Sequence, residues 1–418
     1  MDHKKIQDNV HLYVEETKKF KDLTIEVRFL SQINDKNATT RSILALMMQD
    51  RSVKYDTKIK MNSALDNLFG ASLLIRTLGY GSGAVVRFAI RAIDKKYVNE
   101  DILNAQFNFL SEIIFKPLFV ASTFDEAKLT LYNELLRTQD EPRDYAIKLA
   151  QQYAGHDYPL AINIDGELNV LEKITLNDVI AEYHKMLIED EITITIVGDI
   201  KLVDVLNHVD TYLPFTKRET KQDTYYLVKS EKEQIIEVNK DLEQTNLVMV
   251  YNTNIAINDP LYYSLRIATI ALGQLPISLL FTEIREKRSL CYNISSSLIS
   301  FDGVMMIYTG IDDKNLEQSK SLIIEQVASI INNPLADKLM KASKEMLINS
   351  INSITDNPNA ILNFVYQNHL LKQNCSYDDM IELIKQVDNE SVMKAFKQLK
   401  LNTILTLRKK DVSDEKNR

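Results

Sequence analysis

The sequence predicts an α+β fold of two homologous domains, each a mostly antiparallel β-sheet with helices packed on one face, together forming a clamshell. The same order of strand and helix patterns occurs twice along the chain, which is typical of a duplicated domain. Strands within each half are joined by short turns as well as by helices, and such connections favour antiparallel or mixed sheets. The length of 418 residues agrees with two domains, because it exceeds what one hydrophobic core usually holds.

The first half of the chain contains short alternating segments typical of strands and longer segments with helical spacing. Strands are expected at 25–29, 73–78, 85–90 and 192–197, and helices at 40–48, 62–69, 101–115 and 145–153. The glycine-rich segment 79–83 lies between two predicted strands, and no Lys-Ser or Lys-Thr follows it. It therefore predicts a hairpin turn rather than a phosphate-binding loop.

The second half repeats these elements in the same order. Strands are expected at 247–251, 292–298, 304–310 and 403–407, and helices at 260–272, 278–286, 316–331 and 360–368. In each half one helix follows an acidic residue and a proline, Pro142 or Pro358, which a helix N-terminus tolerates. The predicted domains are 1–211 and 232–418, joined by a polar linker at 212–231, and the working surface is expected in a cleft between them.

Composition excludes several classes of protein. The net charge of −8 argues against a nucleic-acid partner, which would need an excess of Lys and Arg. The N-terminus has no apolar core typical of a secretory signal, and the longest apolar stretch, 261–281, is interrupted by Arg266 and Pro276, so no membrane association is expected. Cytoplasmic is the default location. Two cysteines are too few for a disulfide framework or a zinc site of their own.

The segment 281–292 concentrates charge at a predicted change from helix to strand. Arg288 and Tyr292 flank the turn, and both side chains can hydrogen-bond a peptide carbonyl, so the pair is a candidate substrate clamp. The alternative is a solvated, charged helix end whose tyrosine packs on the sheet. The six histidines show no spacing that would chelate a metal, and the residues contain no recognisable nucleophile motif. No metal or other cofactor is therefore expected in this chain.

A resemblance to a known family rests on the residues Ser278-Leu-Leu-Phe-Thr-Glu-Ile-Arg-Glu-Lys-Arg-Ser-Leu-Cys-Tyr292. They are similar to the second-domain signature of the pitrilysin or insulinase zinc metallopeptidases, in the short, two-domain form that also includes the mitochondrial processing peptidases. The order of elements extends the resemblance over nearly the whole chain. The sequence departs from the signature at Ser289, where glycine is usual, and at Leu279, where arginine is frequent.

Active members of this family carry His-x-x-Glu-His on the first long helix and a further glutamate ligand downstream. The resemblance places Ser42 and Leu46 at the two histidine positions and Ala45 at the catalytic glutamate, all on the helix expected at 40–48. Ala127 falls at the third ligand. None of these side chains can bind zinc or abstract a proton, so no activity is expected from this chain alone.

The resemblance implies a non-catalytic subunit of a heterodimeric zinc peptidase. Such a subunit would bind an extended peptide in the inter-domain cleft and supply Arg288 and Tyr292 to the zinc site of an active homologous partner, which alone would hold the zinc. The alternative is a stand-alone peptide-binding or structural scaffold that forms a homodimer and cleaves nothing. In that case an extended peptide would add as a strand to a sheet edge.

Overall fold

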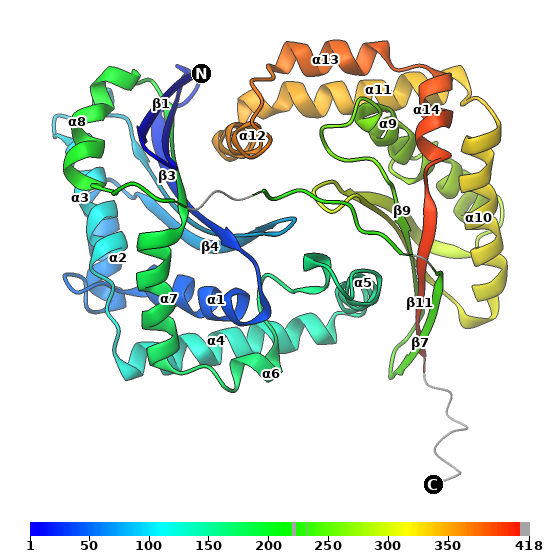
Figure 1. The fold of residues 1–418 in the computed structure, drawn as a ribbon, viewed down its shortest axis with the longest axis horizontal. Coiled ribbons are helices and arrows are strands. Elements are labelled where there is room, and N and C mark those ends of the chain that lie inside the picture. Colours follow the sequence, from blue (N-terminus) through cyan, green and yellow to red (C-terminus); the bar gives the residue numbers. More distant parts are fainter. Residues whose placement is uncertain (220–222, 231, 410–418) are drawn as a thin grey trace, which may run out of the picture. The chain divides into compact units, whose positions relative to one another are not determined.

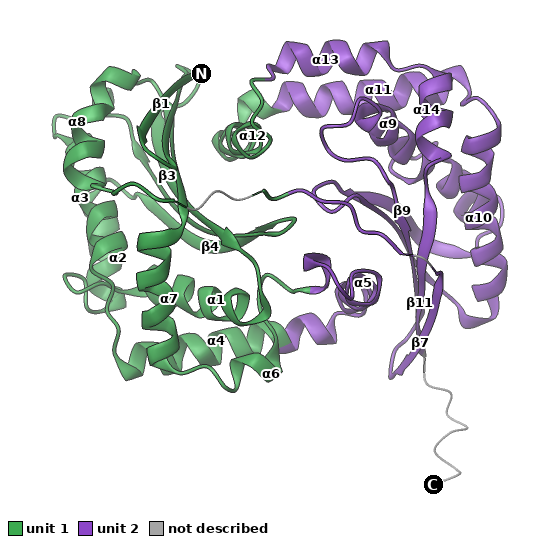
Figure 2. Ribbon diagram, viewed as in Figure 1, with its two compact units in different colours: residues 1–135, 162–224, 354–374 green, residues 136–161, 225–353, 375–418 purple. Residues whose placement is uncertain are grey.

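The computed structural model describes residues 1–219, 223–230 and 232–409. The chain forms two units, and each contains segments from both halves of the sequence (Figure 2). Unit 1 comprises residues 1–135, 162–224 and 354–374, and unit 2 comprises 136–161, 225–353 and 375 onward. Each unit is built on its own mixed β-sheet, which confirms the predicted α+β class with two sheet-based parts.

The sheet of unit 1 has the strand order β1-β2-β6-β3-β5-β4 (Figure 1). Its strands are β1 (Asp2–Gln7), β2 (Val10–Glu16), β3 (Asp22–Gln32), β4 (Ser72–Tyr80), β5 (Gly83–Ile93) and β6 (Glu191–Gly198). All neighbours are antiparallel except β2 and β6, which run parallel. Alternate residues of β3 such as Ile25 and Val27 enter the main core, because side chains of a strand alternate between its two faces.

Helices cover the core face of this sheet. They are α1 (Asp35–Asp50), α2 (Lys58–Asn67), α3 (Ile102–Phe115), α4 (Ala121–Asp140, whose last residues belong to unit 2), α6 (Leu168–Leu171), α7 (Leu176–Glu189) and α8 (Leu202–Tyr212), and the 3₁₀ turn η1 (Lys95–Tyr97) follows β5. Helix α1 starts with a capping box in which the side chains of Asn34 and Asn37 each accept from the other's backbone N–H. Helix α2 ends at Asn67 because Phe69 and Gly70 both adopt positive φ.

The sheet of unit 2 has the order β7-β11-β8-β10-β9, which repeats the five strands from β2 to β4 of unit 1. Its strands are β7 (Gln234–Lys240), β8 (Thr245–Asn252), β9 (Cys291–Ile299), β10 (Val304–Ile311) and β11 (Lys400–Lys409). Again one pair, β7 with β11, is parallel and the others are antiparallel. The matching orders support the duplication that the sequence predicts.

The helices of unit 2 gather mainly on one face of its sheet (Figure 1). They are α9 (Tyr262–Gly273), the π-helical segment η3 (Phe281–Glu286), α10 (Leu316–Asn332), α11 (Asp337–Asn352), α13 (Tyr377–Gln386) and α14 (Asn389–Phe396), with the short 3₁₀ turns η2 (Pro159–Ala161) and η4 (Asp313–Asn315). No helix in the described part of the chain has the length and apolar character needed to span a bilayer.

Two helices are exchanged between the halves of the sequence. Helix α5 (Pro142–Ala154) belongs to unit 2, where its alanines pack with β8 and β11, and α12 (Pro358–Leu370), preceded by the 3₁₀ turn η5 (Ser353–Asp356), belongs to unit 1. There Ile361 and Val365 pack against Tyr13 and Val197. Each sheet therefore has one helix on the face opposite its main helical layer. Both exchanged helices begin at the prolines that the sequence repeat singles out.

The structural units group residues in space, whereas the predicted domains divide the chain at 212–231. The predicted domains 1–211 and 232–418 describe the two copies of the sequence repeat, and their bounds stay a prediction. Part of the predicted linker, residues 220–222 and 231, lies outside the described residues. Residues 223 and 224 belong to unit 1 and residue 225 begins a segment of unit 2.

A buried carboxyl group in unit 2 has a consequence for stability. Asp302 lies in the turn between β9 and β10, is 5% exposed, and accepts a hydrogen bond from the hydroxyl of Tyr226. Burial raises the pKa of Asp302 to about 6. The native state therefore holds a proton between about pH 4 and pH 6 that the unfolded chain releases, so this group's contribution to stability is present at low pH and is lost as the pH rises through 6.

Asp302→Asn is expected to increase the free energy of unfolding at pH 7.5 by about 1–3 kcal/mol, because the amide keeps the acceptor for Tyr226 without a buried charge. The gain should shrink towards zero at pH 4. Urea unfolding at several pH values measures this, with exposed Asp312→Asn as the control expected to change little. A wild-type pH dependence that persists in Asp302→Asn would contradict the assignment.

Candidate functional site

The predicted clamp residues lie at the junction of η3 and β9 in unit 2. Ile284 is fully buried and anchors η3, while Arg288 follows the helix and Tyr292 is the second residue of β9. Between them, Ser289 has φ +53°, in the left-handed region that favours glycine. This conformation explains why a glycine is usual at this position of the family's second-domain signature. A serine that adopts it loses about 1 kcal/mol of stability.

Both candidate side chains are accessible. The Arg288 guanidinium donates from Nη1 to the backbone oxygen of Glu283 at 2.7 Å and to its Oε2 at 2.8 Å. Tyr292 is 79% exposed, and the Arg285 guanidinium lies 5.5 Å from its ring centroid. Hydrogen bonds from Lys287 first, and then from Arg288, lower the pKa of the Glu283 carboxyl. The charged helix end of the alternative interpretation is present, but its tyrosine does not pack on the sheet.

The residues that the sequence resemblance assigns to the family's zinc site lie on α1 and α4 in unit 1, and their side chains do not fit a metal. Ser42 is buried, with its Oγ 3.2 Å from Thr77 Oγ1 and 3.3 Å from the carbonyl oxygen of Ile164. Ala45 and Ala127 are buried in the core, and Leu46 is half-buried against it. The side chains of Ala45, Leu46 and Ala127 are aliphatic and have no donor atom for zinc. These positions therefore cannot support zinc-dependent hydrolysis.

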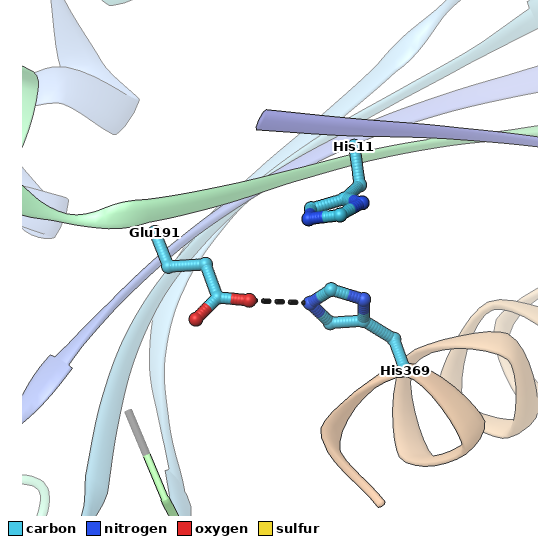
Figure 3. A group of neighbouring side chains, drawn as sticks. All are labelled: His11, Glu191 and His369. Atoms are coloured by element: carbon cyan, nitrogen blue, oxygen red, sulfur yellow. Dashed lines mark hydrogen bonds and ion pairs between the residues drawn. The ribbon is translucent and has the colours of Figure 1, made fainter. Parts of the chain in front are cut away.

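A second cluster of chemically active side chains lies on the other face of the same sheet. His11 on β2, Glu191 at the start of β6 and His369 on α12 each offer one ligand atom, and these atoms lie within 4.8 Å of one another (Figure 3). His369 Nε2 is 2.7 Å from Glu191 Oε1. Both partners of this bond are largely buried, with side-chain exposures of 8% and 11%.

The Nδ1 atom of each histidine in this cluster is engaged by a residue outside it. His369 Nδ1 lies 2.9 Å from the Tyr13 hydroxyl, and His11 Nδ1 lies 3.1 Å from His3 Nε2. Burial, and then the charge of His369, lower the pKa of His11 to about 4. Burial raises the pKa of Tyr13 to about 12, helped by the charge of Glu191. His11 and Tyr13 are therefore both neutral at neutral pH.

A cavity of about 370 Å³ opens beside the cluster. Its lining includes all three cluster residues together with Lys5, Asn9 and Gln373. The space is large enough for several water molecules, since one occupies about 30 Å³ in the liquid. The cluster is therefore open to solvent on one side and fixed by the sheet and α12 on the other.

Sequence reasoning did not find this cluster. The three residues are far apart in the chain and share no chelating spacing. Strands β1 and β2 were not predicted either; β1 is mostly exposed and polar, and the alternation in β2 was overlooked. The alternation in β2 is the signal that was available: Val10, Leu12 and Val14 enter the core, which places His11 and Tyr13 together on the opposite face.

Comparison with known proteins gives a family and several relatives. Residues 173–347 match the family model of the peptidase M16 inactive domain. A probable inactive metalloprotease of Bacillus subtilis, YmfF, is 25% identical over 410 residues, which cover 95% of each chain. An uncharacterised zinc protease of the same organism, YmxG, is 24% identical over 237 residues, which cover 55% of this chain and 57% of that protein.

A solved structure extends the similarity over the full length of the chain. The crystal structure of a conserved protein from Enterococcus faecalis superposes with a TM-score of 0.93 at 28% identity, covering 98% of this chain and 99% of that one. The duplicated strand order of the two sheets and the match over residues 173–347 are both properties of this chain that accompany that similarity. The resemblance seen in the sequence is thus confirmed: residues 173–347 match the inactive domain of the peptidase M16 family, and nearly the whole chain is similar to a probable inactive metalloprotease.

Proposed function

We propose that this chain is a non-catalytic subunit of a heterodimeric zinc peptidase. It binds an extended peptide and supplies Arg288 and Tyr292 to the zinc site of an active, homologous partner. One contrast carries the proposal. The helix α1, to which the resemblance assigns the zinc ligands, carries no histidine or glutamate, whereas Tyr292 is 79% exposed and the Arg288 guanidinium lies at the surface.

The chemistry of the two clamp side chains suits peptide binding. A guanidinium presents several N–H donors in one plane, and a phenol donates one O–H, so both can bind a peptide carbonyl. Near a partner's zinc they would orient the scissile bond and stabilise the negative charge that develops on its oxygen. Neither role requires a metal or a general base in this chain.

The position of β9 supports the binding of an extended peptide. In the strand order of unit 2, β9 is the terminal strand beyond β10, and it begins beside the clamp residues. An edge strand can accept an extended peptide as an additional strand through backbone hydrogen bonds. A peptide bound there would run past Tyr292 at the start of the strand.

The relatives support a partnership between unlike chains. Bacillus subtilis has both a probable inactive metalloprotease and a zinc protease that are similar to this chain. A cell with both kinds of protein can assemble a pair in which one member holds the zinc. For the present chain, the partner to test is a homologue from the same organism with an intact His-x-x-Glu-His motif.

Arg288→Ala is expected to lower peptide cleavage by the reconstituted pair about 10²- to 10³-fold, the usual effect of removing one oxyanion-stabilising donor. The measurement is the initial rate on a fluorogenic peptide library, with and without zinc. Lys287→Ala is the matched control, since Lys287 also bonds Glu283 but is not part of the clamp. Its rate should match the wild type.

Size-exclusion chromatography separates a loss of catalysis from a loss of assembly, because Arg288→Ala should still co-elute with the partner. Unchanged cleavage by an assembled Arg288→Ala pair would exclude the clamp role. A chain that elutes as a homodimer and binds no zinc-containing homologue would exclude the heterodimer and favour the stand-alone scaffold.

A further inference from the structure

We propose that His11, Glu191 and His369 form a binding site for one divalent transition-metal ion, with Zn²⁺ the ion that best suits this set of ligands. The site joins helix α12 to strands β2 and β6 of unit 1. It differs from the expectation, drawn from the sequence, that this chain holds no metal. It is also separate from the family's zinc positions, since α1 packs on the opposite face of the sheet.

The donor atoms are of the right kind and number. Two imidazole nitrogens and one carboxylate oxygen form a ligand set that proteins use for zinc, with a fourth position left to water. The adjoining cavity of about 370 Å³ has room for that water. In a tetrahedral zinc site, ligand atoms about 2.0–2.2 Å from the ion lie roughly 3.3–3.6 Å apart.

The observed spacing brackets this value. His369 Nε2 and Glu191 Oε1 are 2.7 Å apart, bonded to each other, and the widest separation among the three ligand atoms is below 4.8 Å. An ion would take the place of the proton in the His369–Glu191 hydrogen bond and draw His11 inward. The neutral His369 ring then carries its one proton on Nδ1, where it donates to the Tyr13 hydroxyl, and any further proton leaves to solvent. Shifts below about 1.5 Å are sufficient, and His11 faces the cavity rather than the packed core.

The surroundings hold both imidazoles in the orientation that a metal needs. Ligand histidines usually use one ring nitrogen for the ion and hydrogen-bond through the other. Here the Nδ1 atoms of His369 and His11 are engaged by Tyr13 and His3, which leaves each Nε2 for the ion. A surface His–acid contact such as His156–Asp157, at 83% and 89% exposure, has no such support.

The proposal is tested on the full chain without a histidine tag, after treatment with a chelator. Isothermal titration with Zn²⁺ should give one ion per chain. His11→Gln and His369→Gln should each weaken binding at least 100-fold, and Tyr13→Phe about 10-fold, since loss of a supporting partner typically costs 10- to 100-fold. Zn²⁺ should raise the melting temperature of the wild type and not that of His369→Gln.

Exposed His184 on α7 provides the matched control, and His184→Gln should bind Zn²⁺ as the wild type does. Circular dichroism and unfolding without metal identify any variant that fails to fold, and His11→Gln, whose side chain borders the cavity, is the variant expected to fold normally. Absence of stoichiometric binding to the wild type would overturn the proposal. So would equal affinity of the wild type and a folded His11→Gln.

Discussion

Glu26→Ala is expected to lower the free energy of unfolding by about 3–5 kcal/mol, because it leaves two buried guanidinium groups without their shared counter-ion. Glu26 is fully buried on β3 and accepts from Arg28 Nε at 2.6 Å and from Arg87 Nε. Arginine cannot lose its charge at accessible pH. The two cations would then face each other in the interior of unit 1.

The same network extends to α12. Arg28 Nη2 donates to Asn363 Oδ1 and Arg87 Nη2 to Asn359 Oδ1, each at 2.6 Å, and the Arg28 guanidinium lies 4.3 Å from the Tyr366 ring centroid. Loss of Glu26 should therefore loosen α12 as well as the sheet. Hydrogen exchange in residues 358–370 should increase more than in the helices of the main core.

Urea denaturation followed by circular dichroism measures the effect of Glu26→Ala on stability. Glu26→Gln, which keeps an acceptor but not the charge, should fall between the wild type and Glu26→Ala. Asp56→Ala removes the carboxylate of an exposed ion pair with Lys60 and is expected to cost less than about 1 kcal/mol. Equal losses for Glu26→Ala and Asp56→Ala would show that the buried cluster contributes no more than a surface pair.

Asp190→Ala is expected to cost about 3–5 kcal/mol and more than Arg41→Met, although the two residues form one buried ion pair. Arg41 on α1 is fully buried and donates to Asp190 from Nη1 at 2.7 Å and from Nη2 at 3.0 Å. Its Nε bonds Glu182 at 2.6 Å. Removal of Asp190 leaves a permanent buried cation with Glu182 as its one carboxylate partner in the described part of the chain.

Removal of Arg41 is more easily accommodated, since burial already raises the pKa of the Asp190 carboxyl. Without the guanidinium, Asp190 can take up a proton and become neutral. Arg41→Met also keeps most of the apolar volume of the side chain. Unfolding of both single variants and of the double variant gives their coupling energy, and a smaller loss for Asp190→Ala than for Arg41→Met would contradict this asymmetry.

Much of the fold could be predicted because it is encoded locally. Every strand expected from an alternating pattern lies inside an observed strand, such as 192–197 within β6 and 304–310 within β10. The helix expected at 62–69 is displaced to 58–67, since positive φ at Phe69 ends it earlier. The N-terminal hairpin of β1 and β2 was missed, because β1 is mostly exposed and its charged residues carry no burial pattern.

The candidate clamp could likewise be predicted only in part from the sequence. Arg288 and Tyr292 are four residues apart, so the turn between helix and strand could be predicted from a single segment. The π-helical form of η3 and the left-handed conformation of Ser289 could not, since a serine ordinarily avoids positive φ and no residue of the segment signals a π-helix. The role of the clamp in a partner's active site stays a prediction for the reconstituted pair to test.

The sequence by itself determined the α+β class, the duplication and the absence of a His-x-x-Glu-His motif, because periodicity and side-chain chemistry are properties of short segments. Only the tertiary structure decided that α5 and α12 pack in opposite units, and that His11, Glu191 and His369 meet. Those contacts join residues that are distant along the chain. Their formation depends on burying apolar surface such as Ile361 and Val365 against the sheet, which no local pattern specifies.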